Sequence, residues 1–202
     1  RYTPGFEKAK ELIDQGAIGE LFYVESEYAH DYRFVIPDAS NWRADPQRSG
    51  FLGGGCHAVD LLRWIAGDPL EVMAYANKKM LRYLPTDDCT ISILKFPHEV
   101  IGKVFVSIGC KRDYTMRSAF YGSKGTIVAD NTSPFITLYQ ESLNGGELFG
   151  CGTEEIPIRY PVALGNHNTI GEIADFVEAI VTGKPVKTAA RQGAATVAAC
   201  LA

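Results

Sequence analysis

Long apolar runs, clusters of basic residues and paired cysteines are all missing from this 202-residue sequence. No run approaches the roughly 20 apolar residues that a membrane span needs, so we expect no transmembrane segment. A net charge of −4 without Lys/Arg clusters argues against nucleic acid or a membrane surface as a partner. The residues that are present, 46% hydrophobic and 22% charged, are typical of a globular chain with its own core.

The cysteines form no C-x-x-C pair and no Cys/His spacing typical of a zinc site, so we expect no metal. Their odd number and wide spacing favour reduced, mostly buried thiols, which fit a cytoplasmic protein best. The five are Cys56, Cys89, Cys110, Cys151 and Cys200.

Hydrophobic periodicity divides the chain into helices and strands. Residues 4–16, 56–66 and 168–181 have helical spacing, whereas residues 21–31 alternate as in a strand. Between the later helices, strand candidates follow one another through short turns, which favours antiparallel pairing. These candidates are residues 70–80, 88–96, 100–109, 114–121, 125–129, 134–140 and 153–159. The order predicts an α+β domain, a mainly antiparallel sheet with helices packed on one face.

The ends of the helices carry their own signals. Thr3 and Pro4 are typical of a helix start, and Thr169 with Glu172 matches a capping box. The alanine-rich end of the chain favours a helix and has no stop signal after Gly193. We therefore expect that the sequence is a fragment, cut at both termini.

The segment SGFLGGGCHAVDLLRWIAGDP, residues 49–69, is the most informative. On a helix, His57, Asp60 and Trp64 share one face, and His57 falls in the first turn after three glycines. A helix N-terminus disfavours protonation of a nearby imidazole, and the neutral form is what a general base needs. From spacing alone, a His/Asp pair that only caps the helix is the simpler interpretation.

Residues 32–55 form a long irregular stretch with aromatic and arginine side chains, typical of a loop that forms part of a site. Trp42 and Arg43 in it could hold a polyhydroxylated or anionic substrate by stacking and hydrogen bonds. Alternatively, Trp42 packs and Arg43 pairs with Asp45 to anchor the loop. His167 is a further candidate for the pocket, although a surface or capping role is the simpler alternative.

An ordered set of motifs resembles the C-terminal domain of the Gfo/Idh/MocA oxidoreductases over essentially the whole chain. They are RYTP leading into AKELIDQGAIGELFYVESE, then NWR, HAVDLLRWIAGDP, YGSKGTIVAD and HNTIGEIADFVEAIVTGKPV. The resemblance implies that residues 1–202 form one substrate-binding and oligomerisation domain built on an open sheet. It also implies an upstream Rossmann domain, absent from this chain, that binds most of an NAD or NADP cofactor.

The resemblance also implies an activity. Active members of the family oxidise a hydroxyl of a sugar or polyol, and the family histidine matches His57, which would take the hydroxyl proton. Trp42, Arg43, Asp60 and His167 are then the candidate substrate contacts in this chain. We identify no cofactor-binding residue here, and we expect a homodimer or homotetramer formed through the sheet.

One position departs from the family pattern. Many family dehydrogenases carry an aspartate four residues before the histidine, and this chain has Gly53 there. Another group therefore replaces that carboxylate, or the chemistry differs. The alternatives are an NAD-dependent glycoside hydrolase of the same family and a non-catalytic protein that senses a sugar or nucleotide.

Overall fold

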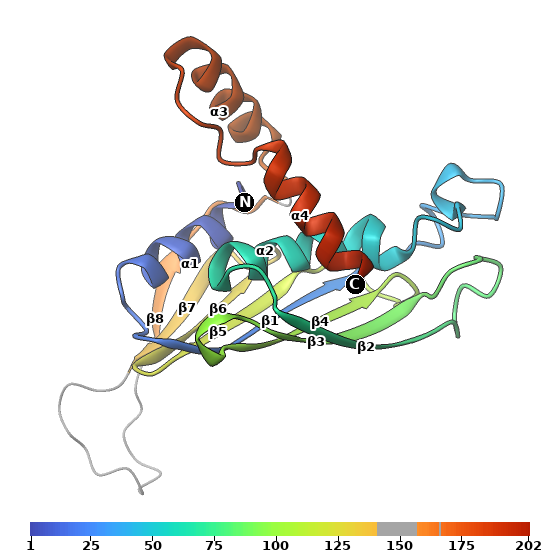
Figure 1. Ribbon diagram of the computed structural model, residues 1–202, viewed down its shortest axis with the longest axis horizontal. Coiled ribbons are helices and arrows are strands. Elements are labelled where there is room, and N and C mark those ends of the chain that lie inside the picture. The colour runs from blue at the N-terminus through green and yellow to red at the C-terminus, as the bar shows by residue number, and fades with distance from the viewer. Residues whose placement is uncertain (141–156, 166) are drawn as a thin grey trace, which may run out of the picture.

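The computed structural model describes residues 1–140, 157–165 and 167–202, which build one eight-stranded sheet against helices (Figure 1). The strand order is β2-β3-β4-β1-β5-β6-β7-β8. Neighbouring strands pair antiparallel, except that the central strand β1 runs parallel to β4. The strands are β1 Leu21–Ala29, β2 Glu71–Asn77, β3 Cys89–Lys95, β4 Ile101–Ser107, β5 Arg117–Gly122, β6 Gly125–Asp130, β7 Phe135–Gln140 and β8 Ile158–Pro161.

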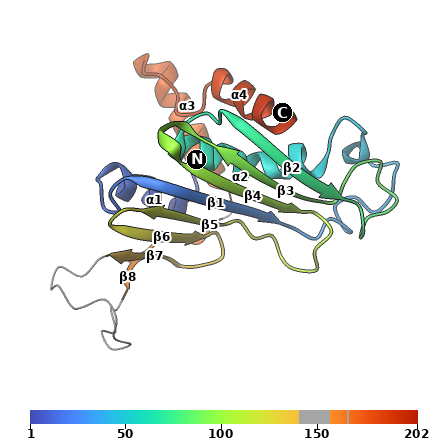
Figure 2. The same ribbon diagram turned by 60° about the horizontal axis from the view of Figure 1, so that its bottom comes forward.

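Among the residues that the structure describes, three of the four helices cover one face of this sheet and none lies on the opposite face (Figures 1 and 2). Helices α1, α2 and α4 lie across the covered face, whereas α3 projects away from it. Their bounds are α1 Pro4–Asp14, α2 Cys56–Ala66, α3 Thr169–Thr182 and α4 Ala190–Leu201. The prediction of an α+β domain with a mainly antiparallel sheet and helices on one face is confirmed.

The core lies between the helices and the covered face of the sheet. Alternation along β1 places Val24, Ser26 and Tyr28 on that face, and all three are buried. From the helix side, Leu62 of α2 is completely buried, as is Phe120 of β5. The core therefore fixes α2 against β1, the contact on which the site depends.

The three glycines belong to a π-helix, Phe51–Gly55, that continues into α2. One local expectation is corrected. The cap of α3 is Asn168, whose side chain accepts a hydrogen bond from the Gly171 backbone N–H at 3.0 Å, and not Thr169, which is the first helical residue. An asparagine oxygen at the cap position satisfies the same unpaired N–H groups as a threonine would.

The cysteines also differ from expectation. Cys56, Cys89, Cys110 and Cys200 are free thiols that are only partly buried. Cys151 and residues 153–156 of the last predicted strand lie outside the described residues, and β8 begins at Ile158. Among the helices described, none is long and apolar enough to cross a membrane.

Candidate functional site

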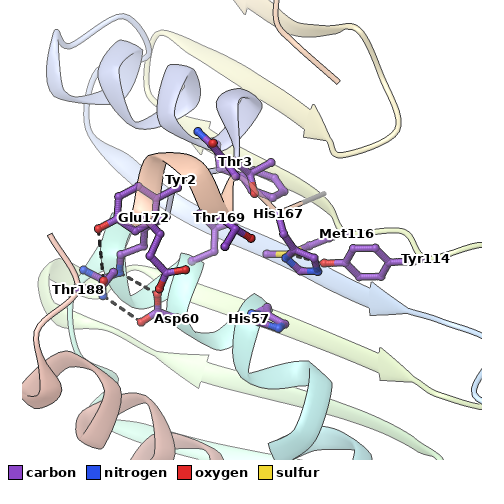
Figure 3. Close-up of a pocket in the computed structure, with 14 residues that line it drawn as sticks. Tyr2, Thr3, His57, Asp60, Tyr114, Met116, His167, Thr169, Glu172 and Thr188 are labelled. Carbon is purple, nitrogen blue, oxygen red and sulfur yellow. Dashed lines mark hydrogen bonds and ion pairs between the residues drawn. The ribbon is translucent and has the colours of Figure 1, made fainter. Parts of the chain in front are cut away.

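A cavity of about 180 Å³ opens where the N-terminal segment, α2, the residues before β5 and the start of α3 meet (Figure 3). Its walls carry two imidazoles, two carboxylates and several hydroxyl groups. It is lined by Arg1, Tyr2, Thr3, Phe6, His57, Asp60, Leu61, Tyr114, Met116, His167, Asn168, Thr169, Glu172 and Thr188. Such a set can bind a small, neutral, polyhydroxylated molecule, because it offers many donors and acceptors beside the apolar side chains of Phe6, Leu61 and Met116.

His57 enters the cavity from α2 and stays open to it on one side. Its ring centroid lies 5.7 Å from that of His167, which stacks at 5.8 Å and 18° on Tyr114. Burial, followed by the neighbouring His167, lowers the pKa of His57 below its ordinary value. A lowered pKa favours the neutral imidazole, the form that can accept a proton.

Asp60, one turn after His57, is held by other parts of the chain. The Arg1 guanidinium donates to both of its carboxylate oxygens, at 2.8 and 3.0 Å, and the Thr196 hydroxyl donates at 2.7 Å. Burial alone would raise the pKa of Asp60, but the hydrogen bonds from Arg1 and Thr196 outweigh it, so the pKa is lowered. Asp60 thus joins the N-terminus and α4 to α2, as a charged anchor at the cavity wall.

Glu172 supplies the other carboxylate of the cavity. It lies in the first turn of α3 and points into the space in Figure 3. Its backbone N–H donates to the Asn168 carbonyl at 3.1 Å, but its side chain makes no hydrogen bond or ion pair with another residue that the structure describes. Because a carboxylate only accepts hydrogen bonds when ionised, Glu172 is free to bind a substrate hydroxyl.

Trp42 and Arg43 lie outside this cavity. Trp42 is 62% exposed, with the guanidinium carbons of Arg43 and Arg48 at 4.3 and 4.6 Å from its ring centroid. The alternative pairing of Arg43 with Asp45 is not what the structure shows, because the Asp45 carboxylate caps the backbone N–H of Gln47 at 2.7 Å. Stacked cation–π contacts, rather than an ion pair, hold this loop surface together.

Gly53 faces the same side as these arginines. It lines a small separate cavity with Arg43 and Arg48, and a Cβ on it would lie 3.3 Å from Nε of Arg48. The carboxylates that line the His57 cavity among the described residues are Asp60 and Glu172. The aspartate that many family members carry at position 53 is therefore not replaced by a carboxylate on an adjacent residue.

Tyr28, His30 and Tyr114 belong to the site region but are not predicted as functional from the sequence. Tyr28 lies near the end of β1 and His30 directly follows the strand, so a period-of-two analysis continued one residue past the strand could have found both. Tyr114 has no local signal, because it meets His167 across 53 positions of sequence. Burial raises the pKa of Tyr114 to about 12, so it stays a neutral phenol.

Comparison with known proteins agrees with this geometry. The family model of the GFO/IDH/MocA C-terminal domain matches residues 6–128, more than half of the chain. The chain belongs to this family. Within it, a myo-inositol 2-dehydrogenase of Thermotoga maritima is 24% identical over 96% of this chain, which spans 55% of that protein.

Shorter and structural matches point the same way. A D-xylose 1-dehydrogenase [NADP(+)] of Haloarcula marismortui is 38% identical over 58 residues, which are 29% of this chain and 15% of that protein. A levoglucosan dehydrogenase solved with NADH and levoglucosan superposes with a TM-score of 0.77 at 21% identity, over 98% of this chain and 59% of that one. At that identity the likeness shows the fold. The chain thus spans little more than half the length of the relatives that it matches along its whole length.

Proposed function

We propose that this chain is the substrate-binding domain of an NAD(P)-dependent dehydrogenase that oxidises a hydroxyl group of a sugar or polyol. The observation that carries the proposal is His57, a neutral imidazole open to a polar cavity, with His167 beside it. Relatives named as inositol, xylose and levoglucosan dehydrogenases support this substrate class.

In the proposed reaction, the carbon that bears the hydroxyl loses a hydride and the oxygen loses a proton, leaving a carbonyl group. The nicotinamide cofactor supplies the acceptor for the hydride. His57 accepts the proton, which its lowered pKa permits at neutral pH. His167 and Glu172 hold neighbouring hydroxyls, and Asp60 keeps α2 in place through Arg1 and Thr196.

We place most of the cofactor site outside this chain. The glycine-rich segment described here is a π-helix whose Gly54 and Gly55 are buried against the sheet, so its backbone cannot wrap a pyrophosphate. This supports residues 1–202 as one substrate domain and a preceding Rossmann domain as the cofactor domain. Whether that cofactor is NAD or NADP depends on the latter.

We also propose that the helix-free face of the sheet forms a homodimer or homotetramer contact in the cytoplasm. Its strands expose large apolar side chains, among them Met73, Tyr75 and Ile93 on β2 and β3. Sedimentation of the whole protein and of an Ile93→Glu variant tests this. A variant that sediments with the same mass as the wild type would contradict the contact.

The activity is tested on the whole protein with NAD and NADP against a panel of levoglucosan, xylose, myo-inositol and related polyols. Reduction of the cofactor with stoichiometric formation of a carbonyl product supports the dehydrogenase. Release of sugar from a chromogenic glycoside without net formation of NADH would support the hydrolase alternative instead. The glycine at position 53 is compatible with that alternative. If sugars raise the melting temperature but none is turned over, the result would support the non-catalytic sensing protein.

A further inference from the structure

The phenol ring of Tyr28 lies directly against Gly54, in the π-helix that leads into α2. A Cβ atom built on Gly54 would lie 2.5 Å from Cε1, 2.6 Å from Cζ and 2.9 Å from the hydroxyl oxygen of Tyr28. Real Cβ atoms do not approach other atoms so closely. Any side chain larger than hydrogen at position 54 would therefore push the ring and the helix apart.

Tyr28 is also anchored through its hydroxyl. It is 6% exposed, its hydroxyl is 2.9 Å from that of Tyr32, and His30 Nδ1 lies 3.5 Å away. A buried phenol needs such a partner, and the bond to Tyr32 holds the hydroxyl end of the ring in place. The ring is thus held both by its hydroxyl and by the close approach of Gly54.

His57 is a further neighbour of the ring. The two ring centroids are 6.1 Å apart and the planes differ by 29°. Gly54 and His57 are three positions apart, where the π-helix continues into α2, so both can face Tyr28 from the same side of the helix.

We propose that Tyr28 is a positioning residue for His57, and that Gly54 is required because only glycine lets the ring reach that place. The proposal rests on the function proposed above, in which His57 is the base. The buried ring excludes water from the side of the imidazole that faces away from the cavity. It also limits rotation of the imidazole, so that one edge stays directed at the substrate.

Several other groups surround His57. They are Asp60 on the same helix, His167 before α3, and Tyr114 before β5, which stacks on His167. The Tyr114 ring centroid also lies 5.2 Å from that of Tyr28, so substitution of Tyr28 removes a contact of Tyr114 as well. Gly54→Ala displaces the Tyr28 ring without removing it, and a change in His57 that is common to both variants therefore reports on the position of that ring.

The test is the pKa of His57 in the whole protein, read by NMR of histidine-labelled samples and assigned by loss of the signal in His57→Gln. Tyr28→Leu removes the ring, and Gly54→Ala displaces it. Both are expected to raise the pKa toward the ordinary value of about 6.5. Tyr28→Phe keeps the ring and is expected to keep the wild-type pKa.

Gly55→Ala is the matched control. Its Cβ would meet Cγ2 of Val106 at 2.5 Å, as tight a contact as at Gly54 and in the same π-helix, but not with Tyr28. It is expected to lower stability without the shift in pKa. An unchanged pKa in Gly54→Ala, a rise in Tyr28→Phe as large as in Tyr28→Leu, or an equal rise in Gly55→Ala would each overturn the proposal.

Kinetics separate this proposal from the proposed function. If His57 is the base, Tyr28→Leu lowers kcat by about 10- to 100-fold with a smaller change in KM, because positioning acts on the transition state. A protein with no dehydrogenase activity would contradict the function, yet the NMR shift would still show Tyr28 positioning the imidazole. An active protein whose His57 pKa ignores Tyr28 would contradict only the positioning.

Discussion

The His57 cavity and the Trp42 loop are two polar, aromatic regions that are built in opposite ways. Around the cavity, two of the functional groups are supported from behind by buried structure: His57 has Tyr28 beneath it, and Asp60 has Arg1 and Thr196 around it. In the loop, the exposed Trp42 is held by two arginines that are only partly buried. Preorganised support distinguishes a site from a surface that merely contains the right residue types.

The largest effect expected from this comparison is on turnover. His57→Ala should lower kcat/KM of the whole enzyme by about 10²- to 10⁴-fold, the usual contribution of a general base. Steady-state kinetics with the best substrate of the panel measures it. The control is His98→Asn, at an exposed turn with φ of 59°, a conformation that asparagine tolerates. Equal rates for His57→Ala and the wild type would remove the imidazole from the mechanism.

The next effect is on stability. Leu62→Ala removes a completely buried side chain from α2, the helix that also presents His57. It should lower the free energy of unfolding by about 2–5 kcal/mol, through lost burial and a cavity in the core. Denaturant titration measures the loss, with the largely exposed Leu70→Ala as control. A similar loss of unfolding free energy in the two variants would show that the packing of α2 contributes no more to stability than an exposed side chain does.

A smaller, pH-dependent effect is expected at Asp60. Its pKa is lowered in the folded protein, so its ion pair stabilises the fold above the unfolded pKa of about 3.9 and less as pH falls through the folded value. Asp60→Asn should therefore cost about 1–3 kcal/mol at pH 7 and progressively less below about pH 4.

The exposed pair of Asp14 with Lys10 on α1 is the comparison for Asp60, since its carboxylate side chain is 59% exposed. Unfolding of Asp60→Asn and Asp14→Asn is followed at pH 7 and pH 3. Asp14→Asn should change stability by less than about 0.5 kcal/mol. A loss in Asp60→Asn that is the same at both pH values would contradict the assignment of the effect to the ionised carboxylate.

The smallest effect is expected in the loop. Trp42→Ala and Arg43→Ala should change KM by less than about threefold, because both side chains lie outside the cavity and make mainly surface contacts. Kinetics over the same substrate panel measures this. A tenfold rise in KM would show that substrate reaches the loop, as the sequence predicts, and would weaken the contrast between the two regions.

Local patterns were enough for most of the fold, because periodicity and turn residues report on burial within one element. They predicted α2 over residues 56–66 and strands close to β3, β4, β6 and β7. The parallel pairing of β1 with β4 was not predictable in this way, since it joins strands about 80 residues apart. The three glycines were ambiguous for the same reason: their partners Tyr28 and Val106 lie on distant strands.

The sequence by itself determined the class of the fold, the helix that presents His57 and, through its motifs, the family. Tertiary structure alone decided which polar residues meet. It brought His167 and Tyr114 to His57, bound Asp60 to Arg1 and left Trp42 on another surface. The physical reason is that periodicity records which side of an element is buried, whereas a site depends on which buried sides face one another.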